Sequence, residues 1–223
     1  MDVLEAIKSR KSIRAFTDQS VPRKTIQKTL EISQREPSGT NTQPWHVYIC
    51  AGAVRQAITD DVLALAAESK AAKYEDYDYY PPVWNDTHRD RRRGVGWELY
   101  GLLGIKKGDR EASAQQGARN FKFFDAPVGL FITVDAYLAK GNWADAGMYA
   151  QTIMLAARSF GLHTCRQAAW IQFQGPIFSH LGIPNDQVLV TGMCLGYADD
   201  SAVENTLVSD REDVANVAHF VGF

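Results

Sequence analysis

Apolar residues recur every three or four positions in several stretches of the chain, which is the spacing of one buried helix face. The clearest stretch is residues 142–161, whose apolar residues at this spacing are Trp143, Ala146, Ala150, Ile153, Met154, Ala157 and Phe160. Gly161 follows them, and glycine suits the C-terminal cap of a helix. Similar patterns predict helices over residues 2–10, 21–36 and 53–72.

Three short apolar runs predict buried strands. They are "HVYIC" at 46–50, "PVGLFITV" at 127–134 and "QVLVTGMCLG" at 187–196. Residues 74–94 break every periodicity and are expected to be irregular. Because helices outnumber strands and the strands are scattered among them, the sequence predicts an α+β fold with one sheet wrapped by helices. The length of 223 residues favours a single domain over residues 1–223.

Composition narrows the class of protein. Hydrophobic residues make up 45% of the chain, which is enough for a sizeable core, and the formal net charge of −2 argues against a nucleic-acid binder held by bulk electrostatics. No apolar run reaches the roughly 18 residues that a membrane helix needs, and the N-terminus lacks the apolar stretch of a signal peptide. Cys50, Cys165 and Cys194 are odd in number and far apart, so we expect no disulfide framework. These features predict a reduced, cytoplasmic protein without nucleic-acid or membrane partners.

Standard catalytic motifs are mostly missing. The chain has no HExxH, G-x-S-x-G, Walker or CxxC motif, and "GVGWELYG" departs from the Rossmann glycine pattern. The histidines stand apart from one another, and we expect His46 and His163 to be structural residues with satisfied hydrogen bonds. Candidate catalytic or binding residues must therefore lie in other segments of the chain.

Two segments carry polar residues in unusual arrangements. In "SRKSIRAF", an extended backbone would turn Arg10, Ser12 and Arg14 to one face and leave Ile13 and Phe16 for the interior. Two guanidinium groups and a hydroxyl on one face suit a phosphate, although a solvated basic patch at a helix end would explain the same residues. In "PSGTNTQPWH", turn chemistry accounts for the Pro, Gly and Asn, but not for a Gln and a Trp beside a second Pro.

Taken in order, "SRKSIRAF", "PSGTNTQPWH", "GLHTCRQAAW" and "GMCLGYAD" followed by "DRED" resemble the FMN-dependent nitroreductase family. The match runs essentially from Met1 to the C-terminus. "TCRQAAW" and the tyrosine-rich middle segment are most similar to the branch that acts on nitrobenzoates. The resemblance implies an α+β sandwich with a central, mainly antiparallel sheet, an intertwined homodimer, and FMN bound at the subunit interface.

The resemblance also assigns residues to parts of this cofactor. Binding of the phosphate and the ribityl–pyrimidine side would fall to Arg10, Lys11, Ser12, Arg14 and Arg211. The segment that lines the flavin from the partner subunit would contribute Pro37, Ser38, Gly39, Asn41 and Gln43, with Trp45 packed beneath it. Arg14 would place positive charge near N1 and O2 of the ring, together with Lys122, for which Arg119 or Asn120 could substitute.

The segment "GLHTCRQAAW" would present backbone N–H groups of Gln167, Ala168 and Ala169 to flavin N5. Related sequences often carry Pro and Glu where this chain has Arg166 and Ala168, so the side-chain interactions made there would be lost. Because the flavin carries the hydride chemistry, no catalytic acid or base is expected. Cys165 is expected to be a buried structural residue.

Aromatic residues crowd the irregular segment 74–94, with Tyr74 and Tyr79 among them. Three are expected to contact the substrate, namely Tyr77, Tyr80 and Trp84. As a lid, this segment would stack on a nitroaromatic ring while the arginines of "RDRRR" attract a carboxylate. An arm that clasps the partner subunit would explain the segment equally well.

These implications predict an FMN-dependent oxidoreductase that uses NADH or NADPH. It would pass hydride through flavin N5 to nitroaromatic or quinone-like acceptors in a ping-pong cycle. Other FMN reactions on the same fold stay open, namely dehalogenation, ene-reduction and flavin destruction, and so does a non-catalytic FMN carrier. The sequence indicates no preference between NADH and NADPH.

Overall fold

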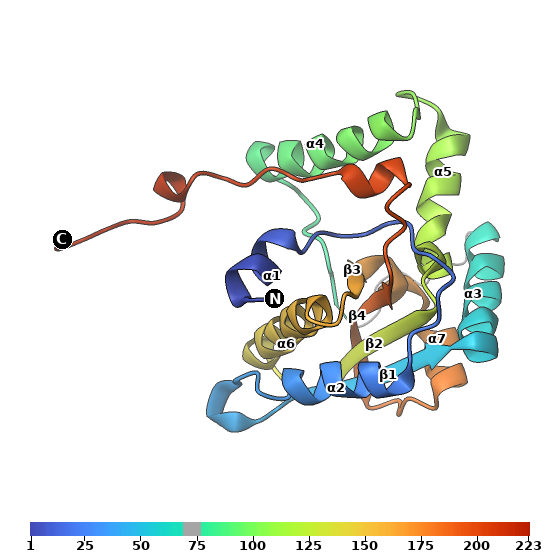
Figure 1. Cartoon of the computed structure of the whole chain (residues 1–223), viewed down its shortest axis with the longest axis horizontal. Helices are drawn as coiled ribbons and strands as arrows, with labels where there is room; N and C mark the ends of the chain where they lie inside the picture. The colour runs from blue at the N-terminus through green and yellow to red at the C-terminus, as the bar shows by residue number, and fades with distance from the viewer. Residues whose placement is uncertain (69–76) are drawn as a thin grey trace.

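The computed structural model describes residues 1–68 and 77–223, so the prediction for Tyr74 lies outside the described residues. The strands of the described residues form one antiparallel sheet in the order β1-β2-β4-β3 (Figure 1). They are β1 (Trp45–Ala51), β2 (Val128–Asp135), β3 (His163–Gln167) and β4 (Gln187–Gly196). The α+β class with a central antiparallel sheet is confirmed, and β1, β2 and β4 occupy the three predicted runs.

Helices surround this sheet. The α-helices are α1 (Val3–Ser9), α2 (Arg23–Ser33), α3 (Gly52–Ala67), α4 (Asp86–Leu102), α5 (Arg110–Ala118), α6 (Lys140–Arg158) and α7 (Gln174–Leu181). Short 3-10 turns are η1 (Gly39–Asn41), η2 (Arg119–Asp125), η3 (Ala168–Phe173), η4 (Val203–Thr206) and η5 (Val214–Asn216). The predictions for α1, α2, α3 and α6 are confirmed.

Side chains of β2 alternate between two cores on opposite faces of the sheet. Leu130 and Ile132 pack with Ile153 of α6 in one core, which residues of α2 also cover. Phe131 lies in the other core with Ile58 of α3 and residues of α7 and η3. Figure 1 shows the resulting layers, with α2 and α6 on one side of the sheet and α3 and α7 on the other.

The expectation of an irregular segment over residues 74–94 is wrong for its second half, because α4 begins at Asp86. Asn85 caps this helix by accepting a hydrogen bond from the backbone N–H of His88 at 2.9 Å. None of the residues of α4 is buried, and charged residues dominate its first half, so no apolar stripe reveals the start of this helix. The Asn85 cap and the contacts of α4 with other elements, such as η4, therefore stabilise this helix.

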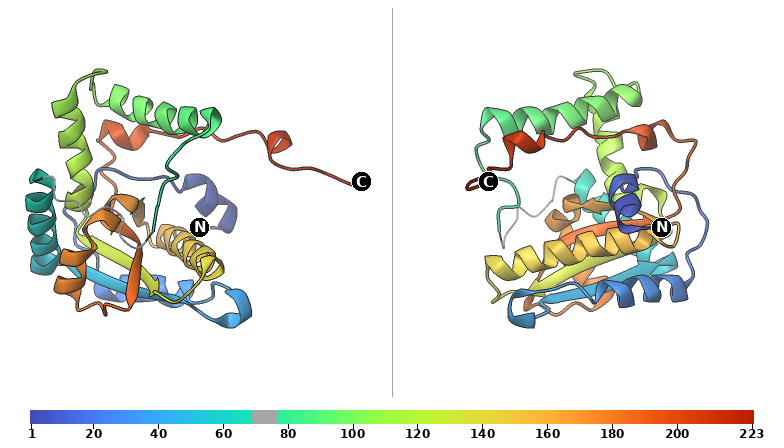
Figure 2. Two further views of the ribbon diagram at one scale, coloured as in Figure 1. Left: turned by 180° about the vertical axis from the view of Figure 1, so that it is seen from behind. Right: turned by 60° about the vertical axis from the view of Figure 1, so that its left-hand side comes forward.

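Figure 2 shows α4 and α5 standing away from the sheet, with the C-terminal segment running past α4 and ending outside the body of the molecule. The last residues of that segment are exposed, Phe220 at 74% and Phe223 fully. Within the described ranges, no helix is long and apolar enough to cross a membrane. The space between the sheet and the α4–α5 pair is where the candidate site is found.

Candidate functional site

Positive charges converge on one cavity of about 430 Å³ beside α1. Its basic lining residues are Lys8, Arg10, Lys11, Arg14 and Arg211, and Ser12 and Ser209 add hydroxyl groups. No carboxylate is among its described lining residues. All five residues predicted to bind the phosphate side therefore meet at one place, although Arg211 is far from the others in sequence. Such a set of donors suits a phosphate, so we refer to this space as the cationic cavity.

The extended backbone predicted for residues 10–16 explains how these donors share a face. Ile13 and Phe16 are buried at 1% and 6% exposure, while Ser12 pairs with Thr164 of β3 in an isolated parallel bridge. The Ile13 N–H donates to the Thr164 carbonyl at 3.1 Å. Alternation then turns Ser12 and Arg14 toward the cationic cavity, which favours a built binding site over a solvated basic patch.

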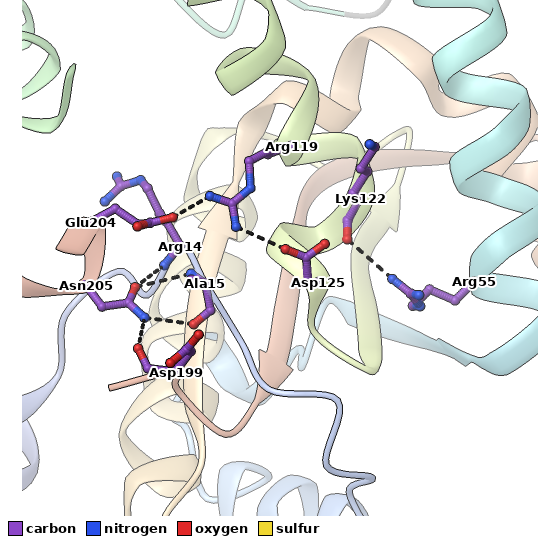
Figure 3. Close-up of polar contacts among 9 residues, drawn as sticks. All are labelled: Arg14, Ala15, Arg55, Arg119, Lys122, Asp125, Asp199, Glu204 and Asn205. Carbon is purple, nitrogen blue, oxygen red and sulfur yellow. Dashed lines mark hydrogen bonds and ion pairs between the residues drawn. The ribbon is translucent and has the colours of Figure 1, made fainter. Parts of the chain in front are cut away.

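A buried amide from η4 fixes this segment. Oδ1 of Asn205 accepts the backbone N–H of Arg14 at 2.8 Å and that of Ala15 at 3.2 Å. Its Nδ2 donates to the carbonyls of Ala15 and Asp199, at 2.8 and 2.9 Å (Figure 3). Nζ of Lys11 also donates to the Asn205 backbone carbonyl. The basic segment is thus held by residues some 190 positions away, without using its guanidinium groups.

A second cavity, of about 370 Å³, adjoins the first at Arg14, which lines both. Its lining comes from residues before α4, from α4 and α5, and from η2, β3 and η3. The residues are Arg14, Tyr79, Tyr80, Leu99, Tyr100, Gln116, Gly117, Asn120, Phe124, Cys165, Arg166, Gln167, Ala168 and Ala169. Its walls are aromatic and amide-rich, and its charged residues are Arg14 and Arg166. We call this space the aromatic cavity.

The predicted segment Gln167–Ala169 lies on the wall of the aromatic cavity. The side chain of Gln167 is buried and fixed, because its Nε2 donates to the Asn120 carbonyl at 2.7 Å. Its Oε1 accepts from Nε1 of Trp170 at 3.3 Å. Ala168 and Ala169 begin η3, so their small side chains leave backbone close to the cavity.

Left-handed backbone ends η2, and of the polar residues of η2 Asn120 alone is among the described lining residues of the aromatic cavity. Phe123, Phe124 and Asp125 all have positive φ, at 54°, 51° and 72°, a conformation that is uncommon for residues other than glycine. Asn120 lines the cavity, whereas Lys122 lines neither cavity and its side chain extends away from Arg14 in Figure 3.

Neither Lys122 nor Arg119 is available to the aromatic cavity in this arrangement. Arg119 is bound in ion pairs with Glu204 and with Asp125, the latter at 3.0 Å. The arrangement therefore favours Asn120 over Lys122 and Arg119, and the role of Lys122 stays an unsupported prediction.

The loop predicted to line the flavin lies away from both cavities of this chain. None of its predicted residues, Pro37, Ser38, Gly39, Asn41 and Gln43, lines either cavity. Asn41 and Gln43 have positive φ, at 60° and 47°, and so does Thr40, which precedes Asn41. The Gly39 N–H donates to the buried Asp145 carboxylate of α6 at 3.2 Å, and the Gln43 N–H donates to the Ser38 hydroxyl at 2.9 Å.

Trp45, which follows that loop, packs in a core with residues of α6, and its place beneath the loop stays a prediction. It is buried at 7% exposure and stacks on Tyr149 of α6 with ring centroids 4.4 Å apart. Burial raises the pKa of the Tyr149 hydroxyl to about 12. This hydroxyl accepts a hydrogen bond from Nε2 of Gln34 at 2.9 Å, so the stacked pair is linked to the C-terminal end of α2.

The three aromatic residues predicted to contact substrate have different surroundings. Tyr80 lines the aromatic cavity, and burial raises the pKa of its hydroxyl. Trp84 lies behind Tyr80, with ring centroids 5.6 Å apart. Tyr77 is directed elsewhere, because its hydroxyl donates to the Leu189 carbonyl at 2.9 Å and its ring packs edge-on against Trp143.

The arginines of "RDRRR" do not line the aromatic cavity, which corrects the expectation that they attract a substrate carboxylate there. Arg89 pairs with Asp86 at 2.7 Å, and Arg91 pairs with Glu212 of the C-terminal segment. Arg92 lies over the rings of Tyr80 and Trp84.

Cysteine and histidine predictions have mixed outcomes. The described residues contain the three cysteines as buried, unpaired thiols, and Cys165 lies opposite Cys194 in the β3–β4 register. His46 is satisfied by Asp135 at 3.0 Å. His163 is not, because its buried Nδ1 has no partner in the described part of the chain, and burial lowers its pKa to about 4.

Several lining residues carried no sequence signal. Leu99 and Tyr100 belong to the unpredicted α4, Gln116 belongs to the unpredicted α5, and Tyr79 was noted only as part of an aromatic cluster. The sequence marked Arg166 as a departure from related sequences but assigned it no ligand. The aromatic clustering could have identified Tyr79, whereas the positions of the α4 and α5 residues depend on long-range packing.

An α+β sandwich with a cationic cavity joined to an aromatic one defines a class: proteins suited to a flat ligand with an anionic tail. Within that class the family is clear, because the sequence profile of the nitroreductase family matches residues 7–197. The chain belongs to the nitroreductase family, and the predicted membership is confirmed.

Individual relatives agree with this family. A 4-nitrobenzoate reductase of Pseudomonas putida is 38% identical over 217 residues, which are 97% of this chain and 94% of the relative. A 4-nitrobenzoate reductase of Nocardioides sp. is 39% identical over 93% of this chain and 85% of its own length. Among solved structures, the FMN and NADPH-dependent nitroreductase NfnB from sphigopyxis sp. strain HMH is 36% identical. It superimposes with a TM-score of 0.96 over all of both chains.

Proposed function

We propose that this chain is an FMN-dependent oxidoreductase that uses NADPH or NADH to reduce nitroaromatic compounds. The observation that carries the proposal is the placement of Arg14 on both the cationic and the aromatic cavity. A flat ring bearing a phosphorylated side chain needs one anion-binding space continuous with one aromatic space. The relatives named above, 4-nitrobenzoate reductases and an FMN and NADPH-dependent nitroreductase, support the same reading.

The residues present fit FMN on chemical grounds. Five basic side chains in a cavity with no acidic residue among its described lining match a phosphate, and Arg14 continues that positive charge toward the ring side. When bound, FMN would supply the chemistry by accepting hydride from the nucleotide and delivering it to the acceptor. The backbone of Gln167, Ala168 and Ala169 would orient the ring, and Arg14 would stabilise negative charge that develops on it.

The side chains of this chain bind and position ligands rather than exchange protons with them. Gln167 is held by Asn120 and Trp170, so its backbone is fixed before any ligand arrives. Aromatic side chains such as Tyr80 and Phe124 line the cavity, where they would shield a bound ring from water. This division of labour fits the absence of a standard catalytic motif in the sequence.

We further propose that the functional unit is a homodimer, in which the loop with Ser38, Asn41 and Gln43 serves the partner's site. The strained backbone of this loop is held by Asp145 although it lines neither cavity of its own subunit, which supports a role in a second copy. The C-terminal segment carries exposed apolar residues, among them Phe220 and Phe223, that a partner would cover. A cytoplasmic location stays a prediction, in keeping with three buried, unpaired cysteines.

The absorbance spectrum of the purified protein tests the cofactor first. We expect the two visible flavin bands and their bleaching under anaerobic conditions when NADPH or NADH is added, followed by recovery with 4-nitrobenzoate. Bands that stay unbleached with both nucleotides would favour the FMN carrier. Bleaching without recovery by any nitroarene would favour dehalogenation, ene-reduction or flavin destruction. No flavin after incubation with FMN would overturn the proposal.

Light scattering on the full chain tests the dimer. We expect twice the chain mass for the full protein and a monomer when the chain is truncated after Asp213, which removes Phe220 and Phe223 but keeps Arg211. Because each site would need the partner's loop, the monomer should also lose flavin affinity. A truncated chain that remains a dimer with unchanged affinity would contradict this role of the C-terminal segment.

A further inference from the structure

Arg166 has a position in the aromatic cavity that the proposed function does not use. It stands on β3 directly before the Gln167–Ala169 segment, and its side chain is exposed while Cys165 and Gln167 on either side are buried. The charged residues of this cavity are Arg14 and Arg166, and no described lining residue is acidic. Because Arg14 is assigned to the cofactor, Arg166 is the other charged residue of the aromatic cavity that could bind a second ligand there.

The guanidinium group of Arg166 is oriented but not neutralised. Its Nη1 donates to the Tyr79 hydroxyl at 3.2 Å, and its Cζ lies 5.9 Å from the centre of the Tyr79 ring. Among the described residues, no carboxylate forms an ion pair with it. A guanidinium group with one hydroxyl partner keeps most of its donors free for an anion.

Tyr79 and Tyr80 place an aromatic wall beside this charge. Their ring centroids lie 4.7 Å apart at an interplanar angle of 89°, and both residues line the cavity. Arg92 and Trp84 pack against Tyr80 from behind, which keeps its ring in place. A flat apolar surface next to an unpaired guanidinium group fits a ligand that is an aromatic ring bearing a carboxylate.

We propose that Arg166 binds the carboxylate of the aromatic substrate and so determines the preference of this site for carboxylated nitroarenes. This inference rests on the proposed function. It assigns the carboxylate-binding role to Arg166 rather than to the arginines of α4, because Arg89 and Arg91 have acidic partners and neither they nor Arg92 lines the cavity. Arg166 acts by contact with the substrate, and Tyr79 is the positioning residue that holds it.

The test compares 4-nitrobenzoate with 4-nitrobenzamide, which has nearly the same shape but no charge. In Arg166→Gln we expect kcat/KM for 4-nitrobenzoate to fall about 10- to 100-fold, the range expected when one charge-assisted pair is lost. The fall should lie mainly in KM, and the value for 4-nitrobenzamide should stay within about 3-fold, because mutations without a partner interaction have small effects. Arg166→Lys should recover part of the loss.

A matched control removes a nearby charge that lines neither cavity. Arg93 is exposed on α4, so Arg93→Gln changes the net charge equally and should affect both substrates alike. A readout that needs no turnover is the equilibrium binding of benzoate and benzamide to the flavin-loaded protein, followed by calorimetry. Arg166→Gln should weaken benzoate binding selectively, as it does for turnover.

Three results would overturn the proposal. Equal losses for 4-nitrobenzoate and 4-nitrobenzamide would show a structural role, and a rise in KM for NADPH but not NADH would assign Arg166 to the nucleotide phosphate. A selective loss in Arg93→Gln equal to that in Arg166→Gln would show a long-range charge effect. Failure of the proposed function is distinct: the protein would reduce neither nitroarene, while selective binding of benzoate over benzamide would still report on Arg166.

Discussion

The side chain of Asn205 accepts the backbone N–H of Arg14 at 2.8 Å and is itself 6% exposed. This bond joins a turn near the C-terminus to the basic segment near the N-terminus, at the residue that lines both cavities. The guanidinium group of Arg14 is left out of the arrangement, apart from a bond to the Ser12 carbonyl at 3.3 Å. Asn205 therefore positions Arg14 through its backbone and leaves its charge for a ligand.

Replacing Asn205 should weaken both the fold and flavin binding. Asn205→Leu leaves the N–H groups of Arg14 and Ala15 without their buried acceptor, and an unsatisfied buried donor costs about 1–3 kcal/mol. We expect the free energy of unfolding to fall by at least that amount and the Kd for FMN to rise. Urea unfolding and quenching of flavin fluorescence measure the two effects. Asn185→Leu is the control, because Asn185 is exposed and lines neither the cationic nor the aromatic cavity.

Gly192 on β4 faces the ring of Trp170, and a Cβ built there would lie 2.3 Å from Cδ1 of that ring. Gly192→Ala should therefore destabilise the fold by about 1–3 kcal/mol through overpacking. It should also reduce flavin affinity, because displacement of Trp170 breaks its bond to Gln167. Thermal unfolding and flavin titration check both effects.

A second variant keeps the Gly192 result interpretable. Trp170→Phe combined with Gly192→Ala should recover part of the stability, because the smaller ring makes room for the added methyl group. Gly94→Ala in exposed α4 has open space around its Cβ position and should raise stability by about 0.5–1 kcal/mol. Equal effects of Gly94→Ala and Gly192→Ala would show that the close approach to Trp170 is unimportant.

Sequence periodicity succeeded where one face of an element is buried. Residues such as Ile153 of α6 and Leu130 of β2 recur at the spacing of their elements because they fill the cores on either side of the sheet. The same rule placed Ser12 and Arg14 on one face of an extended segment. It failed for α4, which has no buried residue, and for β3, whose five residues include the polar His163, Arg166 and Gln167.

The sequence predicted most of the residue types of the candidate site, but not which of its side chains face the cavities. The family resemblance predicted that Arg10, Arg14 and Arg211 bind the same phosphate, and all three line one cavity although no local pattern links them. The choice between Lys122 and Asn120 was not predictable, because the two residues lie two positions apart in a 3-10 turn that the sequence did not predict. Phe123 and Phe124 in that turn are residue types that rarely adopt the left-handed backbone seen there.

Arg211 is expected to bind the phosphate of FMN without affecting the ring. Its Nη1 contacts only Ser209 and the Asp210 carbonyl, so its removal breaks no ion pair among the described residues. In Arg211→Gln we expect the Kd for FMN to rise about 10-fold, as for one charge-assisted bond. The Kd for riboflavin, which lacks the phosphate, should not change. Lys28→Gln is the charge control, because Lys28 is an exposed residue of α2. An equal rise in the Kd for riboflavin would contradict the assignment.

His163 should make stability depend on pH in a definite direction. Burial lowers its pKa in the folded protein from 6.5 to about 4, and its buried Nδ1 has no hydrogen-bond partner in the described part of the chain. Between these two pH values the unfolded chain binds the proton and the folded protein resists it. The free energy of unfolding therefore falls as the pH drops from 6.5 toward 4 and rises with pH across that window.

The variant His163→Gln removes this titration. Compared by urea unfolding at pH 7.5 and pH 5, the variant should lose less stability on acidification than the original protein, because glutamine takes up no proton in either state. His88→Gln is the control, since His88 is exposed at the start of α4 and should leave the pH dependence unchanged. An identical loss in His163→Gln and the original protein would mean that other groups, and not the buried imidazole of His163, set the acid sensitivity of the fold.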